Sequence, residues 1–322
     1  MTKQHKVLVT RQFPPAVMKR LQDSFEIIRN EDDHHMAADE ILSLASDVSA
    51  IMCDPTNIFD AKLISKLPES IGLITTFSVG YDHLDAQAAR EKGILLGNTP
   101  DVLTDATADI ALLCMLGAAR QATSAAKTLR DGKWGRWSST EFLGVHMSGK
   151  SLGILGMGRI GQAVARRARG FDMNIHYHNR RPVTAEGLEE ATYHETLEQM
   201  LKHCQFLSIN CPLTPETHHL IDEARINLLP DNAVIVNTAR GPVVDDSALI
   251  DALKSGKVAA AGLDVFENEP NLDPRYLELD NVFLLPHIGS ATFETRDAMG
   301  FKCCDNLDAF FSGKPLPNPI SI

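Results

Sequence analysis

The sequence predicts an α/β protein made of two doubly wound units, each built around a parallel sheet. Short apolar segments alternate with segments of helical periodicity in residues 6–98, and the alternation returns from residue 150 onward. Strands that alternate with helices in this way form parallel sheets. A chain of 322 residues also exceeds the size at which one hydrophobic core usually stops growing, so two domains are expected.

The first unit contains four segments that we expect to be buried strands, separated by helices. The expected strands are residues 6–10, 48–54, 71–79 and 93–98. The expected helices are residues 14–25, 60–68 and 85–93. Two prolines open the first of these helices, where the first turn accommodates them.

The second unit follows a long helix, expected at residues 103–130, and a loop that contains Trp134 and Trp137. It opens with residues 150–179, whose pattern is strand, glycine-rich turn, helix and second strand. Further strands are expected within residues 204–214, 232–241, 258–266 and 281–289. Residues 295–313 then predict one amphipathic helix that must pack on another part of the protein.

Composition excludes several classes of function. A net charge of −11 argues against non-specific binding of nucleic acid, because a phosphate backbone would be repelled. The six cysteines lack CxxC spacing, so we expect free thiols in a reducing compartment. The chain starts without a signal-peptide pattern, and its longest apolar run, residues 110–119, is about half the length that spans a bilayer. We therefore expect a cytoplasmic protein that binds no membrane.

Three glycines mark an anion-binding turn in the second unit. Gly156, Gly158 and Gly161 follow an apolar strand directly and open an amphipathic helix. The first glycine allows the tight turn, the second lets the backbone approach a pyrophosphate, and the third allows close packing of helix on strand. Because the required strand and helix are both present, the motif predicts a dinucleotide-binding Rossmann domain.

The end of the second strand indicates which dinucleotide is bound. An acid that binds the adenosine ribose is expected there, but the sequence has Asn179, Arg180 and Arg181. Asparagine removes the charge that repels a 2′-phosphate, and two guanidiniums supply donors for it. We therefore expect NADP(H) to be preferred, with NAD(H) as the alternative cofactor. A solvated loop without any ligand is the other interpretation of two neighbouring arginines.

Three polar residues follow later strands at their carboxyl ends, where open α/β sheets place ligands. They are Arg240 in "NTARGPVVDDSAL", Glu269 in "AAGLDVFENEP" and His287 in "LLPHIGSAT". Singly, they could be a surface ion pair, an acid at a helix start and a loop histidine. Together, beside a nicotinamide, they suit proton transfer and carboxylate binding.

These segments, with "SVGYDHLD" and "GMGRIG", resemble the D-isomer-specific 2-hydroxyacid dehydrogenase family over nearly the whole chain. The subgroup they resemble most is the glyoxylate/hydroxypyruvate reductases. The resemblance implies a Rossmann cofactor domain at residues 99–289. It also implies a flavodoxin-like substrate domain formed by residues 1–98 and 290–322, with a cleft between the two domains. A homodimer is implied as well.

The resemblance assigns roles to the three polar residues, none of which is substituted. Arg240 binds the carboxylate and carbonyl of the substrate, His287 is the acid/base, and Glu269 is its paired acid. The chemistry agrees, because hydride transfer to a 2-oxo carbon leaves an oxygen that needs a proton. Glu269 would orient the imidazole and favour its protonated form.

Further site residues are implied only by the resemblance. The backbone amides of Val79 and Gly80 contribute to substrate binding. Trp137 reaches the substrate site of a partner subunit, although Trp134 and Trp137 could equally pin the loop to their own domain. Residues expected at the cofactor besides those already named are Thr107, Arg159, Ile160, Pro212, Thr238, Asp264 and Gly289.

No metal is expected. The histidines within residues 32–36, and the pair His218 and His219, lack a third ligand at suitable spacing. The sequence thus predicts an NADPH-preferring reductase of small 2-oxo acids, glyoxylate and hydroxypyruvate first. One alternative keeps the fold and uses another 2-hydroxy acid with NAD. The other is a dinucleotide-sensing protein of the corepressor type that binds protein partners and catalyses nothing.

Overall fold

The computed structural model describes residues 5–320, and the chain divides into two compact units. One unit combines the segment up to Leu103 with the segment from Ser290 onward. The other is the continuous segment Thr104–Gly289. Each unit contains one all-parallel sheet, of five and seven strands, so the predicted α/β class is confirmed.

The sheet of the first unit has the strand order β2-β1-β3-β4-β5, which is the flavodoxin-like order. Its strands are β1 (Lys6–Val9), β2 (Glu26–Arg29), β3 (Ala50–Cys53), β4 (Leu73–Thr76) and β5 (Leu95–Gly97). Strand β2 was not predicted. It lies at the edge of the sheet with partly exposed side chains, and its two isoleucines are too few to show a pattern.

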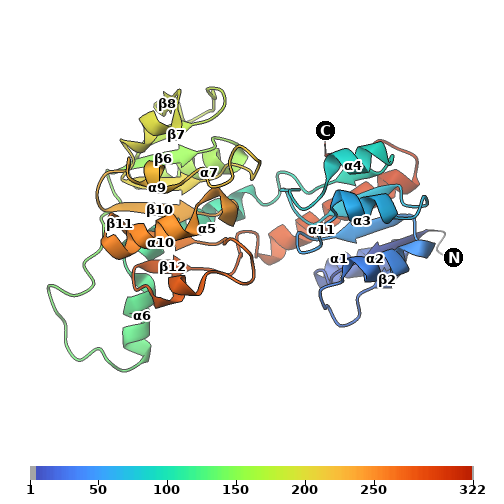
Figure 1. Ribbon diagram of the computed structural model, residues 1–322, viewed down its shortest axis with the longest axis horizontal. Coiled ribbons are helices and arrows are strands. Elements are labelled where there is room, and N and C mark those ends of the chain that lie inside the picture. Colours follow the sequence, from blue (N-terminus) through green and yellow to red (C-terminus); the bar gives the residue numbers. More distant parts are fainter. Residues whose placement is uncertain (1–4, 321–322) are drawn as a thin grey trace. The chain divides into compact units, whose positions relative to one another are not determined.

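Helices cover both faces of this sheet (Figure 1). They are α1 (Pro15–Ser24), α2 (Ala38–Leu44), α3 (Ala61–Lys66), α4 (Ala86–Glu91) and α11 (Phe293–Phe311), with a short 3-10 helix at Ala45–Asp47. Helices α3 and α4 begin where Asp60 and Asp85 accept the amides of Leu63 and Ala88. The predicted C-terminal helix is α11, which packs beside α1 through Cys303, Cys304 and Leu307.

The sheet of the second unit has the order β12-β11-β10-β9-β6-β7-β8. Its strands are β6 (Ser151–Leu155), β7 (Asn174–His178), β8 (Thr192–His194), β9 (Phe206–Ile209), β10 (Ala233–Asn237), β11 (Val258–Leu263) and β12 (Val282–Leu284). Counted from β6, this is the Rossmann order with a seventh strand added at one edge. The order reverses between β6 and β9, and crevices for ligands form at such switch points. Strand β8, a short edge strand, was not predicted.

The helices of the second unit differ from the sequence prediction in one respect. They are α5 (Thr104–Ala119), α6 (Ala122–Arg130), α7 (Arg159–Arg169), α8 (Leu197–Leu201), α9 (Glu223–Ile226) and α10 (Asp246–Ser255), with 3-10 helices at Gly241–Val243 and Pro274–Glu278. The single helix expected at residues 103–130 is wrong. The Ala119 carbonyl accepts the amide of Val145 at 2.8 Å, and Gln121 adopts a left-handed conformation with φ 51°. A segment distant in sequence therefore ends α5.

Helix α6 and the loop after it project from the rest of the second unit, at the lower left of Figure 1. Helix α6 has no buried residue, and Leu129 is 62% exposed. Trp134 and Trp137 are 56% and 77% exposed, so more than half of each residue's surface faces solvent. This segment therefore presents apolar side chains to solvent.

All six cysteines are buried thiols. Burial raises the pKa of each thiol, for example that of Cys204 to about 12, so these groups stay protonated and unreactive. None of the helices within residues 5–320 combines the length and the apolar character needed to cross a membrane.

Close packing of α5 on β11 leads to a stability prediction. A Cβ added at Gly262 would overlap the carbonyl group of Cys114 in α5, which is backbone and cannot turn away. Gly262→Ala should therefore destabilise the second unit by about 1–3 kcal/mol, measured by urea unfolding. Gly135→Ala is the control, because a Cβ there meets open space. Equal stability of the two variants would contradict this account of the packing.

Candidate active site

Arg240 lies three residues after the carboxyl end of β10. Asn237, the last residue of the strand, accepts the amide of Ala239 at 3.0 Å and donates to the Arg240 carbonyl at 2.9 Å. The Arg240 side chain donates to the Ala239 carbonyl at 2.8 Å and is partly buried. These bonds fix the turn from which the Arg240 side chain extends. Asn237 is therefore a positioning residue, and the sequence alone did not indicate this role.

The segments after β11 and β12 bring Glu269 and His287 together. Nδ1 of His287 lies 2.7 Å from Oε2 of Glu269, and the other carboxylate oxygen accepts the amide of Phe266 at 2.8 Å. Burial alone would raise the pKa of Glu269. The bond and charge of His287, the Phe266 amide and the charge of Arg240 outweigh burial and lower that pKa. Glu269 is therefore an anion beside the imidazole.

Asp264 holds the loop that carries His287. It is 1% exposed, and its two oxygens accept the amides of Ile288 and Gly289 at 2.7 Å each. Burial raises the pKa of Asp264, although these two amide bonds and the charge of His287 oppose the rise. His287 itself has φ 52°, a left-handed conformation that is rare outside glycine and costs free energy. The paired amide bonds offset that cost.

The three glycines of the predicted phosphate loop occupy three different environments. Gly156 has φ 93°, and a Cβ there would lie 2.7 Å from the backbone nitrogen of Cys211. A Cβ at Gly161 would overlap the Gly156 carbonyl, whereas a Cβ at Gly158 would meet open space. A tight turn, an open approach for a ligand and close packing of helix on strand are the three features that a dinucleotide requires here.

Other features near this loop also fit a dinucleotide. Arg159 and Ile160 begin α7, and no side chain caps the amides of that helix start. The Thr238 hydroxyl, after β10, is buried and has no hydrogen-bond partner among residues 5–320. Such a group usually has a partner, so a ligand atom would satisfy it. Pro212, after β9, is exposed, and Thr107 donates to the Gly289 carbonyl at 3.4 Å.

The segment after β7 presents the two arginines to solvent. Asn179 donates to the Arg181 carbonyl at 3.1 Å, which shapes the turn, and the Asn179 carbonyl accepts from the Tyr193 hydroxyl at 3.4 Å. Arg180 and Arg181 are exposed, and neither forms an ion pair with a carboxylate of the described residues. Both guanidiniums can therefore bind an external anion by donating hydrogen bonds to it.

In the first unit, the turn after β4 exposes two backbone donors. The carbonyls of Val79 and Gly80 accept from Asn98 at 2.9 Å and from Ser78 at 2.6 Å. Their amides donate to no protein acceptor within residues 5–320. Two neighbouring amides without protein partners can bind a carboxylate oxygen.

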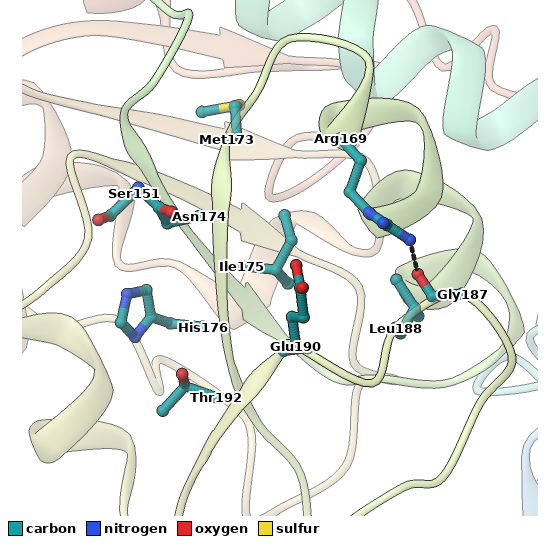
Figure 2. A pocket seen from close by; sticks show the side chains of 11 residues that line it. Ser151, Arg169, Met173, Asn174, Ile175, His176, Gly187, Leu188, Glu190 and Thr192 are labelled. Atoms are coloured by element: carbon teal, nitrogen blue, oxygen red, sulfur yellow. Dashed lines mark hydrogen bonds between the residues drawn. The ribbon is translucent and has the colours of Figure 1, made fainter.

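A cavity of about 320 Å³ lies elsewhere in the second unit (Figure 2). Ser151, Asn174 and Thr192 line it, and they are the first residues of β6, β7 and the edge strand β8. Because the strands are parallel, their amino ends lie on the same side of the sheet. The glycine loop follows the carboxyl end of β6, on the opposite side. Arg169, which also lines it, donates to the Gly187 carbonyl (Figure 2). The cavity is therefore separate from the groups described above.

One histidine of this cavity belongs to a cluster. His176 contacts His194 through ring nitrogens 3.0 Å apart, and His203 stacks on both rings. Burial lowers the pKa of His176, and the charges of His194 and His203 lower it further. Burial, with His203 and His178, likewise lowers the pKa of His194. The folded protein therefore favours neutral imidazoles here.

The expectation that His218 and His219 lack a third metal-binding group nearby is wrong. Nε2 of His219 lies 3.3 Å from Oε1 of Glu267, a third group capable of binding a metal. Glu267 follows His219 by 48 residues, and only the fold brings the two loops together. Spacing along the chain could not have revealed this.

Comparison with known proteins identifies the family. Residues 112–289 match the family model described as "D-isomer specific 2-hydroxyacid dehydrogenase, NAD binding domain". The chain belongs to this family. It is an NAD(P)-dependent 2-hydroxyacid dehydrogenase, and the expectation from its motifs is confirmed.

Relatives match over almost the full length. The chain is 42% identical to a glycerate dehydrogenase from Hyphomicrobium methylovorum, with 97% of both chains covered. It is 41% identical to a glyoxylate reductase from Pyrococcus furiosus, with 98% of this chain and 95% of the other covered. An NADPH-dependent glyoxylate/hydroxypyruvate reductase from Sinorhizobium meliloti, crystallised with NADP and malonate, has a TM-score of 0.89 at 37% identity. That similarity covers 99% of this chain and 97% of the other.

The histidine cluster makes the second unit sensitive to acid. Because the fold lowers the pKa of His176 and His194, the unfolded chain binds more protons as pH falls through the ordinary value of 6.5. The contribution of these two histidines to the unfolding free energy is therefore fully present above that pH, and it is lost as pH falls toward their lowered pKa values. His176→Gln should reduce the loss of unfolding free energy between pH 7 and pH 5, measured by urea unfolding. The exposed His35→Gln is the control, and identical pH profiles for both variants would refute the effect.

Proposed function

We propose that this dehydrogenase is an NADPH-preferring reductase of small 2-oxo acids, glyoxylate and hydroxypyruvate first. The observation that carries the proposal is the 2.7 Å bond between Glu269 and His287, with the charge of Arg240 acting on the same carboxylate. The names of relatives such as the Pyrococcus furiosus glyoxylate reductase support this substrate class. A small 2-oxo acid carries the two groups, a carboxylate and a carbonyl, that these side chains suit.

Arg240 is assigned to substrate binding. A guanidinium presents parallel donors that match a carboxylate and the neighbouring carbonyl oxygen. The hydrogen bonds of Asn237 fix the backbone from which the Arg240 side chain extends. Substrate binding therefore has to order little of this segment. We assign the amides of Val79 and Gly80 to substrate binding as well, because they donate to no acceptor of the described chain.

His287 is assigned to proton transfer. Its Nδ1 faces Glu269, so Nε2 is the nitrogen that gives a proton to the developing alkoxide. The anionic Glu269 stabilises the imidazolium and fixes the ring orientation. Reduction takes this proton from His287, and the reverse oxidation returns a proton to the same nitrogen.

The nicotinamide cofactor supplies the hydride when it is bound. Gly156, Gly158 and Gly161, with the start of α7 at Arg159 and Ile160, would hold the pyrophosphate. We assign the residues at the carboxyl ends of the later strands to the nicotinamide half. These are Pro212, Thr238, Asp264 and Gly289, with Thr107 beside them at the start of α5.

NADP(H) preference is assigned to the turn after β7. Arg180 and Arg181 are exposed and lack a carboxylate partner among residues 5–320, while Asn179 occupies the position where an acid would bind the ribose hydroxyl. Two guanidiniums attract a 2′-phosphate, and asparagine does not repel it.

We also propose that the protein is a homodimer in which Trp137 reaches the substrate site of the partner. The 77% exposure of this indole, on a segment that projects from its own unit, supports the proposal. Large aromatic side chains are enriched at protein interfaces because they bury much area at little entropic cost.

Substitution of the proposed catalytic groups tests the function. His287→Gln should lower kcat for NADPH-dependent glyoxylate reduction by about 10²–10⁴-fold, because general acid catalysis is lost. Arg240→Lys keeps the charge but loses the fork, so it should raise KM strongly. His35→Gln, in the first unit, is the matched control. Normal turnover by His287→Gln would refute the assignment. If the unaltered protein turned over none of a panel of 2-oxo acids, the sensing protein would be favoured instead.

The cofactor assignment is tested separately. The double variant Arg180→Ala, Arg181→Ala should raise the Kd of NADPH by about tenfold or more and change that of NADH little, because only the former carries the 2′-phosphate. Arg166→Ala, an exposed arginine on α7, controls for loss of surface charge. Equal losses for NADPH and NADH, measured by fluorescence titration, would refute a role in phosphate recognition.

A further inference from the structure

Three side chains of the second unit that the proposed reaction does not use converge on one point. His218 and His219 lie on the loop between β9 and α9, and Glu267 lies after β11. One nitrogen of each histidine and one carboxylate oxygen of Glu267 all lie within 4.8 Å of one another. The two imidazole rings stack with centroids 4.1 Å apart.

The distances suit shared coordination better than a direct hydrogen bond. Nε2 of His219 lies 3.3 and 3.4 Å from the two oxygens of Glu267. The hydrogen-bonded pair of His287 and Glu269 is much closer, at 2.7 Å. Two ligands bound about 2.0–2.1 Å from a tetrahedral zinc ion lie about 3.4 Å from each other. The spacing of His219 and Glu267 therefore leaves room for an ion between them.

We propose that His218, His219 and Glu267 bind one divalent transition-metal ion of the zinc type. Two imidazole nitrogens and one carboxylate oxygen form a donor set that such ions prefer, whereas Mg²⁺ and Ca²⁺ favour oxygen ligands throughout. His219 and Glu267 are partly buried and held by their loops. His218 is exposed, so its ring can turn to complete the third bond, and water fills the remaining position.

The charge around Glu267 also favours a cation. Asp246, at the start of α10, hydrogen-bonds the amide of Glu267, and the charges of the two carboxylates repel each other. The Asp246 carboxylate also accepts the Tyr276 hydroxyl at 2.8 Å. A metal ion on Glu267 would relieve the repulsion between two partly buried acids.

The proposed metal site would join two segments that adjoin the active-site residues. The His219 amide donates to the Pro242 carbonyl at 2.7 Å, two residues beyond Arg240. Glu267 precedes Glu269 by two residues, and a Cβ at Gly241 would overlap the backbone of Phe266 and Glu267. A metal bound here would therefore fix the loop after β9 against the segments that carry Arg240 and Glu269.

Zinc titration of the full-length protein tests the proposal. The chelator-treated protein should bind one equivalent of Zn²⁺ tightly, measured by competition with a chromogenic chelator. His219→Ala and Glu267→Gln should each weaken that binding at least about tenfold, because even outer groups of metal sites have effects of this size. His218→Ala should do the same and, as an exposed substitution, should leave the fold intact by circular dichroism. Acidic pH should weaken binding, because the ligands must be deprotonated.

The controls separate this site from other histidines of the chain. His287→Ala removes the other histidine–glutamate pair, His203→Ala alters the histidine cluster, and His35→Ala alters the other adjacent pair of histidines. All three should keep the tight equivalent. Unchanged zinc affinity in folded His218→Ala, His219→Ala and Glu267→Gln would overturn the proposal. Loss of the tight equivalent in any control would equally overturn it, whatever the outcome of the activity assays.

Discussion

The proposed acid–base group depends on one buried carboxylate. Asp264 accepts two consecutive backbone amides after β12, and these bonds hold His287 in a left-handed conformation with its Nδ1 against Glu269. A carboxyl group at 1% exposure is costly to bury unless donors surround its oxygens, and two amides at 2.7 Å provide them. The position of the histidine is therefore set by a residue that uses both of its oxygens to hold the backbone.

The sequence contained enough information for most of the fold, because buried parallel strands are nearly continuous apolar segments. The errors have local physical causes. Strands β2 and β8 lie at sheet edges, where several side chains are exposed. These strands therefore lack the continuous apolar sequence by which buried strands are predicted. Residues with high helix propensity continue past Ala119. However, the Ala119 carbonyl accepts a hydrogen bond from the amide of Val145, so a contact distant in sequence ends α5. The periodicity of apolar residues within one segment cannot predict such a contact.

Residues of the candidate site could be identified in the sequence where they fall within short motifs. The glycine loop occupies six consecutive residues, and each glycine meets the environment that its position predicts. Contacts between separate loops were not predictable. The approach of Glu267 to His219, and that of the partly buried Asp246 to Glu267, depend on how the segments after β9, β10 and β11 fold together. Asn237 was visible in the sequence, but only its hydrogen bonds reveal that it fixes the turn at Arg240.

The discontinuity of the first unit has a consequence for biosynthesis. Helix α11 supplies Cys303, Cys304 and Leu307 to the core beside β1, and the Asn306 side chain donates to Thr75 in β4. A ribosome therefore releases the first 103 residues long before the helix that completes their core. The continuous segment Thr104–Gly289 emerges whole in the interval and can fold first. A nascent chain would thus carry an incomplete first sheet, a target for chaperones, until α11 has left the exit tunnel.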